Sequence, residues 1–110
     1  MYAAFRVENR VDGICFELIA DEPDRLLTSR RFDSLGEALR GLTELREHAG
    51  VRDRFRALQT AAGDCYFEFL DQDGQALATS RHFTSFKQLL QGEARLAIFH
   101  AAPLESDETG

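Results

Sequence analysis

The sequence of 110 residues contains few of the features that build metal centres or membrane spans. It has 2 cysteines and 3 histidines, and their spacing includes no Cys-x-x-Cys or histidine cluster that would predict a structural zinc site. No apolar run approaches the roughly 20 residues of a membrane-spanning helix. We therefore expect no metal, no other cofactor and no membrane span.

Positive charge is also scarce. Lysine and arginine together number 13 against 19 acidic residues, which gives a net charge of -6. This balance argues against general nucleic-acid binding, because phosphate contacts need a positive surface. The first residues lack the basic start and apolar core of a secretory signal, so we expect a cytoplasmic protein.

One stretch of the chain occurs twice. LLTSRRFDSLGEALRGLTEL, residues 26–45, is followed 51 residues later by LATSRHFTSFKQLLQGEARL. At the same shift, residues 16–49 match their counterparts at 11 of 34 positions. Such self-similarity indicates a duplicated supersecondary unit.

Each copy of the unit predicts three strands and then a helix. Alternating apolar and polar residues between turn residues predict the strands, and an apolar stripe at helical spacing predicts each helix. Capping boxes at Ser34 and Ser85 mark the helix starts, and Gly50 and Pro103 mark the ends. The strands are expected at residues 4–8, 14–20, 26–31, 54–59, 65–70 and 77–82.

The predicted fold class is α+β. Two tandem βββα repeats, about 4–50 and 54–101, form one antiparallel sheet with two helices packed on one face, related by a pseudo-twofold axis. They make a single domain, residues 1–103, and an acidic tail, 104–110, is expected to be disordered. The strand residues expected beneath the helices are Phe5, Val7, Phe16, Leu18, Leu26, Phe55, Phe67, Phe69 and Leu77. The helix residues expected to cover them are Leu39, Leu42, Leu45, Phe86, Leu90 and Ala97.

The junctions between third strand and helix carry a shared motif. They read Thr28-Ser29-Arg30-Arg31-Phe32 and Thr79-Ser80-Arg81-His82-Phe83. Together with the two βββα units, over about residues 4–100, this motif resembles the YegP-like family of small bacterial proteins. In that family glutamate commonly follows Thr-Ser and tyrosine commonly takes the aromatic position, where this chain has arginine and phenylalanine. The resemblance implies a single sheet shared by two units, in an uncharacterised family with no assigned activity.

The sheet face opposite the helices is the candidate functional surface. Strand parity places there Arg6, Cys15, Glu17, Ile19, Ser29, Arg31, Arg54, Arg56, Tyr66, Glu68, Leu70, Ser80 and His82. Guanidinium groups bind carboxylates or phosphates in a bidentate manner, so arginines on this face suit an acidic partner. The alternative is that Glu17 and Glu68 pair with these arginines across strands and only stabilise the sheet. The candidate partner or anion surface comprises Arg6, Arg31, Arg54, Arg56, Tyr66, Arg81 and His82.

The two cysteines are expected to remain thiols. The alignment of the two units turns Cys65 inward with Phe67, whereas Cys15 faces outward with Glu17. A disulfide needs Cβ atoms about 3.8 Å apart, which residues on opposite faces of a sheet cannot provide.

No pattern in the sequence predicts a catalytic residue. Nothing places a histidine beside a nucleophile and an orienting carboxylate, and there is no glycine-rich phosphate loop. We therefore predict a non-catalytic protein-interaction module that uses the exposed sheet face, as a monomer rather than a homodimer. The alternative is a small-anion binder or an enzyme with its site at the repeat junction, around Arg30, Arg31, Arg81 and His82.

Overall fold

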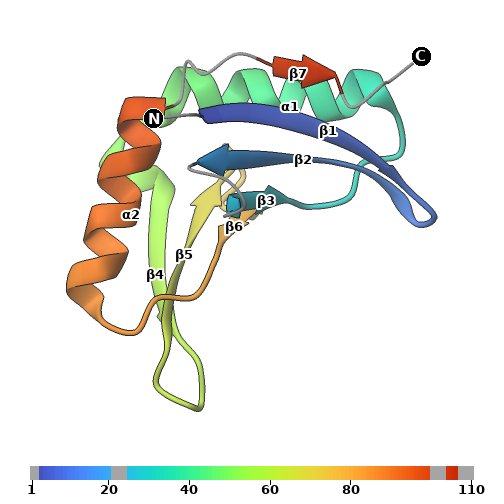
Figure 1. The fold of residues 1–110 in the computed structure, drawn as a ribbon. Coiled ribbons are helices and arrows are strands. Elements are labelled where there is room, and N and C mark those ends of the chain that lie inside the picture. Colours follow the sequence, from blue (N-terminus) through green and yellow to red (C-terminus); the bar gives the residue numbers. More distant parts are fainter. Residues whose placement is uncertain (1–2, 21–24, 100–103, 107–110) are drawn as a thin grey trace.

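A computed structural model describes residues 3–20, 25–99 and 104–106 of the chain (Figure 1). Three strands and a helix follow one another twice along it. The first series is β1 (Ala3–Arg10), β2 (Gly13–Ala20), β3 (Arg25–Ser29) and α1 (Leu35–His48). A short 3-10 turn, Arg52–Arg54, leads into β4 (Phe55–Gln59), β5 (Cys65–Leu70), β6 (Ala76–Ser80) and α2 (Phe86–Phe99), and β7 (Leu104–Ser106) follows.

The strands form one sheet in the order β4-β5-β6-β3-β2-β1-β7. Two antiparallel meanders, β1-β2-β3 and β4-β5-β6, join where β3 pairs antiparallel with β6 around Thr28 and Thr79. Figure 1 shows α1 lying along the β1-β2 half and α2 lying beside the β4-β5 half. The predicted α+β architecture, an antiparallel sheet of six strands with two helices, is therefore confirmed.

The seventh strand was not predicted. Leu104–Ser106 pairs parallel with β1 at the edge of the sheet, within the 104–110 segment that we expected to be disordered. The expectation was wrong for these three residues because a strand this short has no hydrophobic pattern of its own and is held by its neighbour. Residues 107–110 lie outside the described part of the chain.

Capping boxes begin both helices as predicted. The Ser34 hydroxyl accepts the Glu37 amide at 3.2 Å, and the Glu37 carboxylate accepts the Asp33 amide at 3.3 Å. Ser85 and Gln88 repeat the first of these bonds at 3.2 Å. Each box satisfies backbone amides that have no partner within the helix. Among the described residues, neither helix is long and apolar enough to cross a membrane.

The core lies between the two helices and one face of the sheet. Its helix residues include Ala38, Leu42, Leu45, Leu89 and Leu96. Phe86 and Leu90, which we expected to cover the sheet, are instead 56% and 46% exposed. The reason is Gly92, where a Cβ would stand only 2.5 Å from the Phe83 ring, so α2 turns its glycine side to the sheet. The side chain of Ala97 is outside the described set.

A β-bulge in β3 changes which side chains face the helices. Leu18 pairs with Leu27 but Ile19 pairs with Arg25, so Leu26 is an extra residue on β3. Leu26 and Leu27 are both part of the core, and strand alternation resumes one residue out of step. The predicted parity was therefore wrong beyond this point of the strand.

The same bulge occurs in β6, at Leu77. As a consequence Ser29 and Ser80, which we had placed on the face opposite the helices, lie on the helix side and are only 4% and 5% exposed. Thr28 faces the other way, opposite Glu17.

The two buried serines complete the sheet where β3 and β6 leave it. Ser29 Oγ accepts the Phe16 amide at 2.9 Å, and Ser80 Oγ accepts the Phe67 amide at 2.9 Å. Each hydroxyl donates to the carbonyl of the next residue, at 2.8 and 2.7 Å. A side-chain oxygen thus replaces the carbonyl that the departing strand withdraws. The Thr-Ser motif has a structural role in both units.

We predict that Ser80→Ala lowers the free energy of unfolding by about 1–3 kcal/mol, because the buried Phe67 amide loses its acceptor. Ser29→Ala should have a similar cost, since Ser29 makes the matching bonds. Thr43→Ala, on the exposed side of α1, is the control and should change stability by less than about 0.5 kcal/mol. Urea denaturation of the three variants measures this, and equal effects at Ser80 and Thr43 would contradict the assigned role.

Candidate functional site

The sheet face opposite the helices, here called the outer face, carries one row of polar residues across six strands. Directly paired residues project from the same face of a sheet. The row is symmetric about the β3-β6 junction, with arginine at each end, glutamate next and threonine in the middle. Its members are Arg6, Glu17, Thr28, Thr79, Glu68 and Arg56.

In the β1-β2 half, ion pairs cover the outer face. Glu17 is 2% exposed and lies between Arg10, at 3.2 Å, and Arg25, at 3.1 Å. Arg10 also pairs with Glu8 on the same strand. Cys15 and Ile19 are buried on the same face. This half of the predicted surface is closed by its own side chains.

Glu17 is a buried carboxylate on this face. Burial raises the pKa of its carboxyl, and the nearby Glu8 raises it further. The charges of Arg25, Arg10 and Arg6 act in the opposite direction, but the net shift is upward. Burial of the carboxylate and the repulsion from Glu8 together therefore outweigh the attraction of three guanidinium groups.

In the β4-β6 half, the outer face is accessible. The Arg56 side chain is 50% exposed and donates to Glu68 from Nε at 3.0 Å and from Nη2 at 2.5 Å. The Tyr66 ring lies 5.2 Å from the ring of the exposed His82. We call this half the open outer face, and it comprises Arg56, Leu58, Tyr66, Glu68, Leu70 and His82.

Three arginines of the candidate partner or anion surface do not lie on the outer face. Arg54 donates to the Leu70 carbonyl at 2.8 Å, pairs with Glu44 of α1 and stacks over Phe69 on the helix side. It precedes β4, which begins at Phe55, so strand alternation does not apply to it.

Arg31 and Arg81 lie beyond the ends of β3 and β6, where alternation also stops. Arg31 pairs with Asp12 at 3.1 Å, and the Arg81 guanidinium lies over the Phe83 ring at 5.3 Å.

The structure does not bring the predicted junction residues together. The Arg30 amide donates to Leu77 at 2.9 Å, whereas the Arg81 amide donates to Leu26 at 3.1 Å. Because β3 and β6 are antiparallel, these two bonds lie at opposite ends of the strand pair. Arg30 and Arg31 therefore lie at one end of the junction, and Arg81 and His82 lie at the other.

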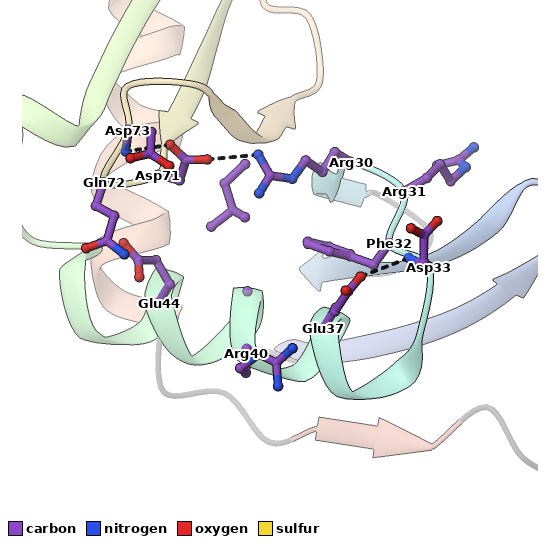
Figure 2. Close-up of a pocket in the computed structure, with 12 residues that line it drawn as sticks. Arg30, Arg31, Phe32, Asp33, Glu37, Arg40, Glu44, Asp71, Gln72 and Asp73 are labelled. Atoms are coloured by element: carbon purple, nitrogen blue, oxygen red, sulfur yellow. Dashed lines mark hydrogen bonds and ion pairs between the residues drawn. The ribbon is translucent and has the colours of Figure 1, made fainter.

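A cleft of about 540 Å³ lies at the Arg30 end (Figure 2). It is bounded by α1 and by the turn between β5 and β6, and three arginines and five carboxylates line it. Figure 2 shows Arg30 reaching across to Asp71, at 2.9 Å. Burial alone would raise the pKa of Asp71, but the amides of Gln75 and Asp73 and the Arg30 guanidinium lower it overall. Small-molecule pockets are mostly apolar with a few polar groups, whereas charged side chains make up most of the lining of this cleft.

A smaller cleft of about 260 Å³ lies at the Arg81 end. Its lining residues follow those of the larger cleft by 51 positions, but Gln88 stands where the first has Glu37, and Arg95 stands where it has Glu44. The charged side chains of this lining are therefore two arginines, Arg81 and Arg95. The sequence repeat could have indicated this second cleft, which our prediction merged with the first.

The remaining polar clusters do not add a site. Cys15 and Cys65 are free thiols, with Cys65 packed against the core and Cys15 on the outer face, as predicted. In the part of the chain that the structure describes, no group of three or more His, Cys, Asp or Glu residues could hold a metal ion.

The arrangement of one sheet with two helices on a single face defines a small α+β fold. Two solved structures share it. The protein of unknown function YegP from E. coli is 19% identical, with a TM-score of 0.89 over 100% of this chain and 97% of that one. A UPF0339 protein from Shewanella oneidensis is 16% identical, with a TM-score of 0.87 over 99% of this chain and 96% of that one. The expected resemblance to YegP-like proteins is confirmed at the level of the fold.

Comparison of the sequence itself gives no further relatives. No family model matches the chain, and no curated protein matches it.

We predict that Glu17 gives the protein a measurable pH dependence. Its folded pKa lies above the ordinary value of 4.5, so the folded protein binds this proton more tightly than the unfolded chain. Its contribution to stability is therefore fully present below the unfolded pKa and is lost as the pH rises through the folded pKa. The stability of the wild type relative to Glu17→Gln should increase as the pH falls from about 7 to about 5.

Urea denaturation at several pH values measures this difference. Glu68→Gln, the matching substitution in the row, controls for the loss of a cross-strand ion pair. A difference between wild type and Glu17→Gln that stays constant over the range would show that Glu17 is not the responsible group.

Proposed function

We propose that this protein is a non-catalytic protein-interaction module that binds its partner through the open outer face. The observation that supports this most is the Tyr66-His82 ring pair beside the half-exposed Arg56, on a face that no described helix covers. Tyrosine and arginine are enriched among the residues that dominate binding energy at protein interfaces. Leu58 and Leu70 are half-buried around the pair and supply apolar area.

The charge pattern suits a partner with both carboxylate and apolar groups. Arg56 has donors available around a guanidinium that is 50% exposed, although Glu68 already accepts from two of its nitrogens. An acidic partner group would share the guanidinium with Glu68. Arg6, at the other end of the row, lies in the half that ion pairs close.

We further propose that the two repeats, about 4–50 and 54–101, act as one domain and as a monomer. The symmetric row of six residues and the matching serine bonds at Ser29 and Ser80 support the repeat. Since the two units already share one sheet, neither needs a second chain to complete its core.

We predict that Tyr66→Ser combined with His82→Ser removes a partner captured by the wild-type protein from a lysate of the source cells. Loss of two interface residues of this kind should weaken binding by about tenfold or more. The matched control is Leu35→Ser combined with Leu90→Ser, which changes two exposed apolar residues of the helices. Thermal unfolding should first show that both variants are folded.

A partner retained by the outer-face variant and lost by the helix variant would contradict the proposal. A partner retained by both variants would also contradict the proposal.

The second candidate function is small-anion binding at the smaller cleft. The observation in its favour is that Arg81 and Arg95 are the charged residues of a lining without carboxylates. Titration with inorganic phosphate, followed by amide chemical shifts, tests this function. Saturable shifts at Arg81, Gln88 and Arg95 that disappear in Arg95→Gln would support it.

A further inference from the structure

The two edges of the sheet differ in how they are covered. β1 is covered by the parallel strand β7, so its outward backbone groups have a partner. β4 stands at the opposite end of the strand order, and no strand of the described chain pairs with its outward edge. An open edge is a template for pairing with another extended segment.

The two edge strands present nearly the same tripeptide. β1 offers Phe5-Arg6-Val7 to β7, and these residues pair with Leu104, Glu105 and Ser106 in that order. β4 carries Phe55-Arg56-Ala57 at the matching place. Phe5 pairs with Leu18 and Phe55 with Phe69, and both pairs belong to the face beneath the helices.

In β4, the backbone groups that do not bond to β5 point toward the open edge of the sheet. Cys65 exchanges two hydrogen bonds with Phe83, at 2.8 and 2.7 Å, on the β6 side of β5. Backbone groups alternate in direction along a strand, so Tyr66 and Glu68 bond in the other direction, to Leu58 and Arg56. The outward carbonyls of β4 therefore belong to Phe55, Ala57 and Gln59. Its outward amides with no partner in the 3-10 turn are those of Ala57 and Gln59, because the Phe55 amide already donates to the Arg52 carbonyl.

The backbone groups of β1 that point away from β2 follow from the same alternation. Ile14 exchanges bonds with Phe32 at 2.9 and 2.7 Å, on the β3 side of β2. By alternation Glu17 bonds to Arg6, and the outward groups of β1 are those of Phe5 and Val7. These groups lie beside β7. The pairing of β7 with β1 is therefore a structural precedent for an extended segment pairing with the open edge of β4.

The two edges of the sheet differ in the residue that pairs with their arginine. At the β1 end, the position paired with Arg6 beyond the meander is held by Glu105 of β7. At the β4 end, Arg56 has Glu68 on one side and the open edge on the other. An acidic residue in a strand paired with β4 at this position would lie beside Arg56, whose side chain is 50% exposed.

We propose that the open edge of β4 binds an extended segment of a partner protein, parallel to β4, that carries an aliphatic, an acidic and a small residue in that order. Backbone hydrogen bonds to Phe55, Ala57 and Gln59 hold the segment, and Arg56 selects its acidic residue. The occupant comes from another protein because the segment of this chain with that pattern, Leu104–Ser106, already pairs with β1. This site deepens the proposed function, but it uses the strand edge in place of Tyr66 and His82.

The experiment uses the full-length, isotope-labelled protein and a synthetic peptide with the sequence of residues 100–110, HAAPLESDETG. Saturable changes in amide chemical shift are expected, largest at Phe55, Ala57 and Gln59. Ala57→Pro removes an outward donor without touching the β4-β5 ladder and should weaken binding about fivefold or more. Ala61→Pro, at the second position of the Thr60–Gly63 turn, is the matched control and should bind like the wild type.

A peptide with arginine in place of its glutamate tests the charge selection, and it should bind more weakly than the parent peptide. Shifts confined to β1 would show exchange with β7 and overturn the proposal, as would the absence of binding at millimolar peptide. Concentration-dependent shifts at β4 without peptide would identify a second copy as the occupant and overturn the partner assignment. Tyr66→Ser with His82→Ser should leave peptide binding intact, so failure of the open outer face and failure of the edge are distinguishable.

Discussion

The rest of the structure depends on the antiparallel pairing of β3 with β6. Leu27, Thr28 and Ser29 pair with Ser80, Thr79 and Ala78, and backbone bonds from Arg30 and Arg81 extend the pairing at both ends. A single three-stranded meander with one helix leaves two edges and a small core. Joining the meanders at this pair removes two edges and makes one sheet beneath both helices. It also decides where the remaining edges lie.

Two local devices make that pairing possible. The bulges at Leu26 and Leu77 turn extra leucines into the core, and the serine hydroxyls replace carbonyls where the strands diverge. A bulge moves every later side chain to the other face, which brings Thr28 and Thr79 into the polar row. The order of charges on the outer face is therefore a consequence of backbone register as much as of composition.

The predictable part of the candidate site was the part within regular strands. Arg56, Tyr66 and Glu68 lie on the outer face as alternation predicted, because β4 and β5 pair without interruption there. Arg31 and Arg54 were misplaced because each lies just outside a strand, where a departing chain or a 3-10 turn sets the side-chain direction. Glu17 was placed correctly, but its burial depends on Arg10 and Arg25 from two neighbouring strands.

The sequence by itself determined both helices and the strands of the two meanders, because local periodicity, capping boxes and the repeat of residues 16–49 depend only on neighbours along the chain. The tertiary structure decided the strand order, the bulged register and the partner of each edge. These depend on contacts between residues far apart in sequence, such as Phe5 with Leu104, and local pattern carries no information about such pairs.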